Sequence, residues 1–263
     1  MNRVRLDQLL VERGLARSRA EAQALLLAGE VILEGAGSRT LKPGQAVSPD
    51  AAVSVVERRR WASRGGEKLE AALDAFGIDL AGLACLDAGA STGGFTDVLL
   101  ARGARVVYAV DVGRGQLIDR LRRDPRVVSM ERTNLRELRT LPVPIDLATL
   151  DLSFISLRLV LPAVRNLLTD AGRVVALVKP QFEAGPELVP RGGVIRDPGV
   201  HEKVLTDVMW AAEDAGLHPH GVIRSPITGA DGNVEFLVDL RCEEGGDDEI
   251  ANFVLRVADL VDA

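Results

Sequence analysis

The sequence is poor in the residues that build disulfides and metal sites, and it lacks long apolar runs. Its 263 residues include two cysteines, Cys85 and Cys242, and three histidines, and none of them stands at a spacing typical of metal ligands. No apolar run approaches the roughly 18 residues that a membrane span needs, and the first residues lack a signal-peptide core. We therefore expect a cytoplasmic protein with reduced thiols, no metal ion and no membrane partner.

Charge is distributed unevenly along the chain. The formal net charge is −6, but residues 1–68 carry 12 basic and 8 acidic side chains, and residues 69–263 carry 20 and 30. A basic front segment ahead of an acidic remainder hints at an appended nucleic-acid-binding module. Composition alone leaves open that this segment is merely soluble.

Residues 1–57 have the pattern of a small α+β module. Apolar residues recur with helical spacing over residues 5–15, and Ser18 to Glu21 form a capping box that predicts the start of a second helix. Short strands are expected at 31–33 and 53–56.

Basic side chains flank the two expected helices and the turn between the strands. If the helices pack antiparallel, these side chains lie along one face and match the phosphates of an RNA backbone. A solvated charged surface is the alternative. The residues concerned are Arg3, Arg5, Arg17, Arg19 and Lys42.

Residues 58–64 are expected to form a basic interdomain linker that ends at a Gly65-Gly66 hinge, and Arg60 and Arg64 are further candidates for RNA contact. Residues 65–263 then alternate apolar strands with amphipathic helices, which predicts a βαβ sheet covered on both faces. The expected strands are 83–87, 105–110, 127–130, 145–150, 173–178, 219–223 and 234–240, and the expected helices are 67–76, 94–102, 115–122, 157–168, 199–215 and 247–260.

The most informative stretch is residues 86–100, LDAGASTGGFTDVLL. It has the pattern of a strand end, a glycine-rich turn and a helix start, where a doubly wound α/β sheet binds a nucleotide-like cofactor. Gly89, Gly93 and Gly94 permit backbone angles and close approaches that a Cβ would forbid. Asp111 ends the next expected strand, where it can accept both hydroxyls of a ribose.

The chemistry of this turn argues against a dinucleotide. A pyrophosphate needs a compact G-x-G-x-x-G turn and a helix N-terminus, whereas this turn reads G-x-x-x-G-G behind Asp87. The Asp87 carboxylate would repel a pyrophosphate but attract the amino group and sulfonium of S-adenosylmethionine. We therefore expect a methyl donor, with a structural turn beside a different ligand as the alternative.

Four ionisable residues fall where a strand or helix meets the expected cofactor face: Lys68, Asp151, Lys179 and Glu235. Two lysines and two carboxylates suit the deprotonation of a sugar hydroxyl, and Lys179 is the best candidate base. A second ammonium at Lys68 would favour the neutral amine of Lys179, while the carboxylates would favour its charged form. Each of the four could also be an ordinary ion-pair partner.

Six motifs, in this order, resemble those of the TlyA family of ribosomal RNA 2′-O-methyltransferases, whose catalytic part has an FtsJ-like fold. They are residues 87–96 (DAGASTGGFT), 111–117 (DVGRGQL), 131–134 (ERTN), 151–156 (DLSFIS), 178–183 (VKPQFE) and 232–235 (GNVE). Residues 3–56 resemble the RNA-binding module named after ribosomal protein S-four. The resemblance spans essentially the whole chain and implies a Rossmann-like class I methyltransferase with a small N-terminal RNA-binding domain.

The resemblance also implies a substrate and a set of site residues. The donor would be S-adenosylmethionine, the substrate cytidine ribose in the rRNA of the ribosomal subunits, and the consequence sensitivity to capreomycin and viomycin. Lys68, Asp151, Lys179 and Glu235 match the family's catalytic tetrad, whereas Arg114 stands where an aromatic residue is usual. A monomer is favoured, and Arg132 joins the candidates for RNA contact. The expected cofactor-binding residues are Asp87, Gly89, Ser91, Gly93, Gly94, Phe95, Asp111, Asn134, Asp151 and Phe154.

Three alternatives compete with this interpretation. Residues 151–154 loosely match the Asp-Pro-Pro-Phe signature of base-directed N-methyltransferases, although those enzymes do not need two lysines. The second alternative is a membrane-active haemolysin, a label attached to this family. The sequence contains no membrane-spanning segment and no strongly amphipathic cationic helix to support it. A non-enzymatic RNA-binding protein with a decayed methyltransferase fold is disfavoured by the intact Asp87, Asp111 and tetrad.

Overall fold

The structure, a computed structural model, describes residues 3–27, 31–34, 41–55, 60–229 and 231–243. It divides into two compact units, Met1–Arg60 and Trp61–Ala263.

The first unit combines two helices with two small antiparallel sheets. The helices are α1 (Leu6–Glu12) and α2 (Arg19–Leu27), and the strands pair β1 (Val4–Arg5) with β3 (Ala46–Val47) and β2 (Val31–Leu33) with β4 (Val53–Val55). The Ser18 hydroxyl accepts the backbone N–H of Glu21 (3.2 Å) at the start of α2, as the capping box predicts, and the Glu21 carboxylate accepts the N–H of Arg17 (2.7 Å).

A buried carboxylate ties this unit together. Asp7, on α1, is 0% exposed and accepts hydrogen bonds from Arg5, Arg19 and Gln23, each at 3.0 Å. The Arg5 guanidinium, which donates to both carboxylate oxygens, holds the pKa of Asp7 well below its usual range. Two of the predicted RNA-binding arginines therefore stabilise the module and are oriented by the same carboxylate.

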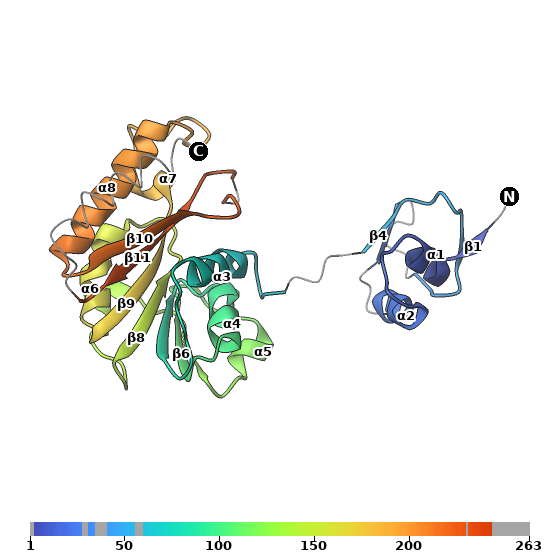
Figure 1. Cartoon of the computed structure of the whole chain (residues 1–263), viewed down its shortest axis with the longest axis horizontal. Coiled ribbons are helices and arrows are strands. Elements are labelled where there is room, and N and C mark those ends of the chain that lie inside the picture. The colour runs from blue at the N-terminus through green and yellow to red at the C-terminus, as the bar shows by residue number, and fades with distance from the viewer. Residues whose placement is uncertain (1–2, 28–30, 35–40, 56–59, 230, 244–263) are drawn as a thin grey trace. The chain divides into compact units, whose positions relative to one another are not determined.

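The second unit is built on one seven-stranded sheet of order β10-β11-β9-β8-β5-β6-β7 (Figure 1). Neighbours among β5 to β9 pair in parallel, and β10 and β11 are antiparallel additions at one side. The strands are β5 (Ala84–Ala88), β6 (Val106–Val110), β7 (Val127–Met130), β8 (Ile145–Leu150), β9 (Leu168–Val178), β10 (His218–Arg224) and β11 (Phe236–Arg241).

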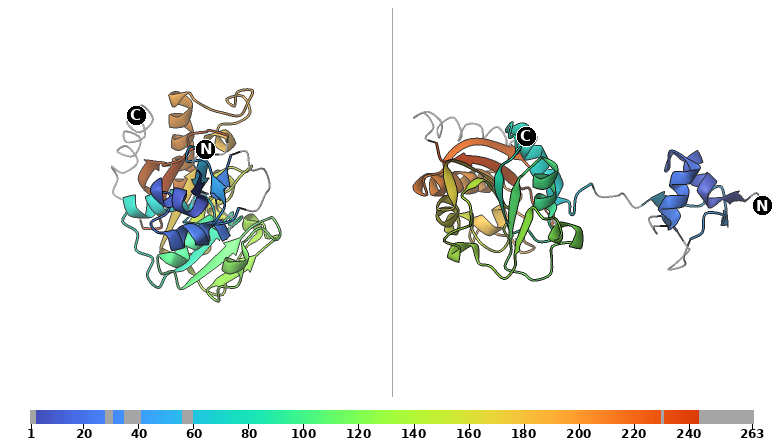
Figure 2. Two further views of the ribbon diagram at one scale, coloured as in Figure 1. Left: turned by 90° about the vertical axis from the view of Figure 1, so that its right-hand side faces the viewer. Right: turned by 90° about the horizontal axis from the view of Figure 1, so that it is seen from below.

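Helices cover both faces of the sheet and bury its apolar strands, which gives the layered arrangement visible in Figures 1 and 2. One face packs against α6 (Leu161–Arg165) and α8 (Pro198–Asp214), through residues such as Leu86 and Leu205. The other packs against α3 (Gly65–Ala75), α4 (Gly94–Ala101) and α5 (Asp119–Arg122), and Cys85 is buried there as a free thiol. Short helical turns complete the unit: η1 (Leu135–Glu137), η2 (Leu157–Leu159) and α7 (Pro180–Glu183).

Expected and observed elements agree over most of this unit. Two expected helices differ: 157–168 is divided into η2 and α6, and of 115–122 only Asp119–Arg122 is helical, as α5. In addition, β9 begins at Leu168 rather than at residue 173. The expected helix 247–260 lies outside the described residues.

The segment expected to be a linker and hinge differs from the structure. Trp61 is 7% exposed, and its indole N–H donates to Glu70 on α3 (3.2 Å). Gly65 and Gly66 form the first turn of α3, and a Cβ on Gly66 would overlap the Trp61 ring. Residues from Trp61 onward therefore belong to the second unit, because burial of one tryptophan fixes the path of the chain.

Candidate active site

The candidate site lies at the edge of the sheet where the parallel strands end. After β5, the strands β6 and β7 are added on one side of it, and β8 and β9 are then added on its other side. In such sheets ligands bind outside the carboxyl ends of the strands, at the point where the order of the strands changes side. Because β11 runs antiparallel and Phe236 pairs with Val178, the first residue of β11 lies at the same edge.

The glycine turn after β5 is shaped by close approaches within the chain. Gly89 has a φ of +84°, and a Cβ on it would overlap the carbonyl oxygen of Asp151; Gly93, at +98°, leaves the room that Leu121 occupies. A Cβ on Gly94 would overlap the hydroxyl of Ser63. These glycines are needed first to bring neighbouring strands and helices against the turn, a reason that the sequence pattern did not provide.

Asp87, the predicted partner of the cationic donor, is completely buried. Its carboxylate accepts hydrogen bonds from the hydroxyls of Thr96 (2.5 Å) and Thr149 (3.5 Å). Burial raises the pKa of Asp87 to about 7, and the nearby Asp151 charge adds to the rise, while the bond from Thr96 opposes it. A positive charge placed nearby would favour the ionised form of Asp87, and the ionised carboxylate in turn attracts a ligand that carries a sulfonium.

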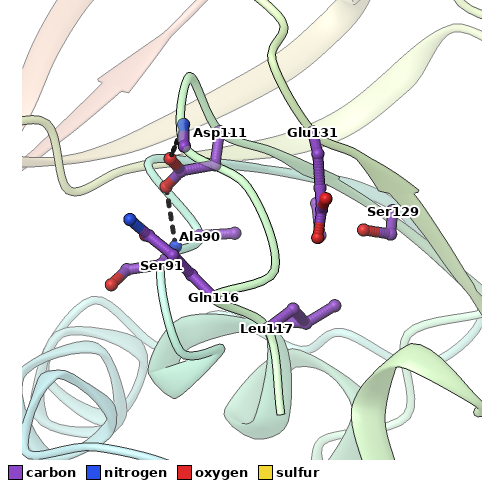
Figure 3. Close-up of a pocket in the computed structure, with 9 residues that line it drawn as sticks. Ala90, Ser91, Asp111, Gln116, Leu117, Ser129 and Glu131 are labelled. Atoms are coloured by element: carbon purple, nitrogen blue, oxygen red, sulfur yellow. Dashed lines mark hydrogen bonds between the residues drawn. The ribbon is translucent and has the colours of Figure 1, made fainter. Parts of the chain in front are cut away.

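Asp111 lies in a shallow hollow beside this turn (Figure 3). Its two carboxylate oxygens accept the backbone N–H groups of Ser91 (2.8 Å) and Gly113 (2.6 Å), which orients the carboxylate toward the turn. A carboxylate oxygen accepts more than one hydrogen bond, so Asp111 can still receive ribose hydroxyls. The residues that line the hollow are Ala90, Ser91, Ala109, Asp111, Gly113, Gln116, Leu117, Ser129 and Glu131.

Gln116, Ser129 and Glu131 were missed as candidate cofactor contacts. Gln116 and Glu131 fall inside the motifs quoted for the family resemblance, which is the signal that could have found them, whereas Ser129 is an ordinary strand residue. A second carboxylate at Glu131 makes this hollow suited to hydroxyl and amino groups rather than to phosphates.

In the part of the chain that the structure describes, three non-glycine residues adopt left-handed backbone angles, and all of them follow strand ends at this edge. They are Ser91 (φ +46°) after β5, Arg132 (φ +53°) after β7 and Phe154 (φ +62°) after β8. Such strained conformations are rare and cluster at functional sites.

The four predicted catalytic side chains form two ion pairs. Lys68 of α3 pairs with Glu235, which immediately precedes β11, and both are buried. Lys179, which follows β9, lies 2.7 Å from Asp151 Oδ1 and donates to the Ser153 hydroxyl at 3.0 Å. Asp151 Oδ1 is buried against the Lys179 ammonium, and because a carboxylate oxygen accepts more than one hydrogen bond, it keeps acceptor capacity at the site.

Other predicted cofactor residues occupy different environments. Phe95 is 3% exposed and belongs to the core beneath the turn. The Asn134 side chain accepts the N–H of Arg136 and donates to Glu137, so it caps η1. Phe154 is 90% exposed, with its ring centroid 5.0 Å from that of Phe182.

Glu183 is a further residue that sequence reasoning missed. Its buried carboxylate accepts the hydroxyl of Ser156 (2.5 Å) and the N–H of Leu157 (2.8 Å), which holds the loop after β8 against α7. Burial raises the pKa of Glu183. This clamp fixes the spacing between Asp151 and Lys179, because it joins the two segments that carry them.

The predicted RNA-binding side chains are all exposed, but several have partners. Arg17 is ion-paired with Glu21 at 3.0 Å, and Arg5 and Arg19 contact Asp7. Arg114, which replaces an expected aromatic residue, is exposed too. The eight candidates are Arg3, Arg5, Arg17, Arg19, Lys42, Arg60, Arg64 and Arg132.

The residues at this edge fit S-adenosylmethionine: an oriented carboxylate for the ribose, a buried carboxylate for positive charge and a glycine turn between them. Comparison supports the assignment. Residues 61–242 match the model of the FtsJ-like methyltransferase family, and residues 4–53 match the S4 domain. A solved S-adenosylmethionine-dependent methyltransferase from Mesorhizobium loti shares the fold (TM-score 0.50, 20% identity, 65% of this chain and 96% of that chain). Fold and site thus define an S-adenosylmethionine-dependent methyltransferase.

Two further similarities narrow the class. The chain is 50% identical to the 16S/23S rRNA (cytidine-2′-O)-methyltransferase TlyA of Mycobacterium tuberculosis, over 92% of this chain and 91% of that protein. A solved structure from Streptococcus thermophilus, named as a candidate hemolysin, covers 100% of this chain and 98% of its own, with 42% identity and a TM-score of 0.72. The chain belongs to the TlyA family, as its motifs predicted.

Two negative findings apply to the described part of the chain. Its helices include none that is both long and apolar enough to cross a membrane. Nor does it bring together three or more His, Cys, Asp or Glu residues in a group that could hold a metal ion.

Replacing Asp87 by Asn should stabilise the donor-free protein at high pH. A carboxyl whose folded-state pKa is raised destabilises the fold as pH rises from its unfolded value, about 4, toward 7. The variant should therefore melt several degrees higher than the parent at pH 8, with no difference below about pH 4. Thermal melts across pH test this, with the exposed Asp119→Asn as control. A gain that does not change with pH would contradict the assignment.

Replacing Asp111 by Ala should weaken donor binding roughly ten- to a hundredfold, because the variant lacks a charged acceptor for ribose hydroxyls. Calorimetric titration with S-adenosylmethionine measures this, and Asp119→Ala on α5 should bind like the parent. An unchanged affinity in a folded Asp111→Ala protein would show that the ribose lies elsewhere.

Proposed function

We propose that this chain transfers a methyl group from S-adenosylmethionine to cytidine 2′-hydroxyls in the rRNA of ribosomal subunits. The observation that carries the proposal is the grouping of Lys68, Asp151, Lys179 and Glu235 at the carboxyl edge, next to the Asp111 hollow. The relative from M. tuberculosis carries the same activity in its name.

Lys179 is the proposed base. A ribose hydroxyl is a poor nucleophile near neutral pH, so a positioned group must take its proton as the oxygen attacks the methyl carbon. The donor supplies that carbon bonded to a sulfonium, a good leaving group. Asp151 and Ser153 hold the Lys179 amine at the strand end, and Asp151 also stabilises the ammonium that forms.

Lys68 and Glu235 form the second half of the tetrad. Their buried ion pair joins α3 to the start of β11. We assign Lys68 a positioning role toward the substrate ribose and phosphate, and Glu235 the orientation of Lys68. Because the two pairs are distinct, Glu235 acts mainly on Lys68 and not on Lys179.

The first unit is the proposed RNA-positioning module. Its sequence matches the S4 domain, and its exposed Arg3 and Lys42 can contact phosphates, since neither forms an ion pair with any described residue. Arg5 and Arg19 present the outer faces of guanidiniums that Asp7 orients. Phosphate contacts of this kind position RNA without reading its sequence.

Location, assembly and phenotype complete the proposal. The protein is a cytoplasmic monomer, and the rRNA methylation that it catalyses makes ribosomes sensitive to capreomycin and viomycin.

A base-directed methyltransferase is the second candidate, because the exposed Phe154 in the 151–154 motif could stack on a base. Nucleoside analysis of methylated rRNA separates the two, since ribose methylation yields a 2′-O-methylnucleoside. Base-methylated cytidine as the product would contradict the proposal.

Replacing Lys179 by Ala should abolish methyl transfer and leave donor and RNA binding nearly intact, because the amine acts on the proton leaving the ribose. A general base contributes about 10²- to 10⁴-fold in rate. Single-turnover methylation of preformed subunit complexes across pH measures this, with Lys203→Ala on the exposed face of α8 as control. Near-normal turnover by Lys179→Ala would assign the proton to another group.

Removing Arg3 and Lys42 together should weaken binding to ribosomal subunits and flatten its salt dependence by about 0.7–0.9 for each phosphate that is no longer neutralised. These two residues are preferred to Arg5 and Arg19, whose removal would also unpair the buried Asp7. Arg13→Ala, at the opposite end of α1 from Arg5, is the control. The module would not be a recognition element if the double variant kept the parent slope.

A further inference from the structure

A second hollow opens at the same sheet edge, on the side covered by α8. Arg224, the last residue of β10, pairs with Phe236 of β11, which in turn pairs with Val178 at the end of β9. The hollow therefore neighbours Glu235 and Lys179 along the sheet. It has an empty volume of about 590 Å³, open to solvent, and is lined by Ile195, Arg196, Pro198, His201, Arg224, Gly232, Val234 and Phe236.

Buried hydrogen bonds build this hollow. The Asn233 side chain, 1% exposed, accepts the N–H of Ile195 (2.9 Å) and donates to the carbonyl of Gly193 (2.9 Å). On the other side, His201 Nε2 lies 3.2 Å from the Ile195 carbonyl oxygen. The backbone that carries Arg196 is thus fixed from both sides.

The second arginine is fixed by the same short segment. The N–H of Ser225 donates to the carbonyl of Glu235 at 2.8 Å, directly after Arg224. Residues 233–236 therefore hold both arginine-bearing segments and also carry the Glu235 that pairs with Lys68. A group bound by the arginines is therefore held beside the segment that carries Glu235.

Two arginine side chains line the hollow without an ion-pair partner among the described residues. Arg196 and Arg224 are exposed, and neither makes an ion pair or a side-chain hydrogen bond with any residue that the structure describes. The nearest acid in sequence, Asp197, accepts the N–H of Gly199 as the cap of α8. Burial lowers the pKa of His201 and the Arg224 charge adds to this, while the Ile195 carbonyl and the Asp197 charge oppose it.

We propose that Arg196 and Arg224 bind a backbone phosphate of the RNA strand close to the nucleotide that is methylated. Guanidinium groups match phosphate oxygens with paired N–H donors. The side chains of Ile195, Val234 and Phe236 also line the hollow, and because they are apolar they offer no hydrogen bonds that could read a base edge. This inference rests on the proposed function, because it assumes RNA as the substrate.

Salt-dependent binding of the full-length protein to isolated ribosomal subunits tests the proposal. The double variant Arg196→Ala/Arg224→Ala should bind roughly tenfold more weakly near 0.1 M salt, with a slope lower by about 0.7–0.9, since the two arginines together neutralise one phosphate. Donor affinity and melting temperature should match the parent. Arg196→Lys/Arg224→Lys should keep most of the slope, since a lysine still neutralises a phosphate.

Arg105→Ala/Arg126→Ala is the control for the loss of two positive charges, because it removes two exposed arginines next to the first residues of β6 and β7, at the opposite edge of the sheet. Unlike Arg196 and Arg224, Arg126 is ion-paired, with Asp124 at 2.8 Å, so the melting temperature of this control is measured as well. A slope for Arg196→Ala/Arg224→Ala equal to that of the parent or of this control would overturn the subsite. So would an equally weakened slope in the lysine variant. Failure of the proposed function would give a different result, because the parent protein itself would then transfer no methyl group to ribose.

Discussion

The site depends on one close approach at the middle of the sheet, where the carbonyl oxygen of Asp151 lies over the α-carbon of Gly89. The N–H of Asp151 donates to the carbonyl of Ala88 (3.0 Å), so the ends of β5 and β8 are joined just before their loops diverge. Only glycine permits this packing and its φ of +84°. The contact places the glycine turn expected to bind the methyl donor next to Asp151, the acid at the end of β8. Methyl transfer requires the donor and the catalytic side chains to be this close.

Buried charge is the second constraint. Asp87 and Glu183 are both held in surroundings that penalise their ionised forms, yet each receives hydrogen bonds that fix a loop at the carboxyl edge. In the first unit Asp7 has the opposite balance, because three donors converge on it. Because the apolar core of this unit is small, the hydrogen bonds around Asp7 contribute much of what fixes the relative positions of its helices and strands.

Sequence periodicity predicted nearly every strand of the sheet, because parallel strands buried on both faces are continuous apolar runs. The acids and glycines at strand ends were found for a related reason: topology alone brings the carboxyl ends together. Pairing could not be predicted. Lys68 pairs with Glu235, and Asp7 pairs with Arg5 and Arg19. These contacts depend on the directions in which side chains point after the helices and strands have packed together. The assumed hinge at Gly65-Gly66 was wrong because composition cannot show that Trp61 packs against Gly66.

The burial of Trp61 has a practical consequence. The chain holds two tryptophans: Trp61 is 7% exposed and seated beside the first turn of α3, whereas Trp210 is 55% exposed on α8. An aqueous collisional quencher such as iodide reaches only the second, so the emission that remains comes from the segment that enters the catalytic unit. The protein thus carries an intrinsic optical reporter of how that entry segment is seated, without any added label.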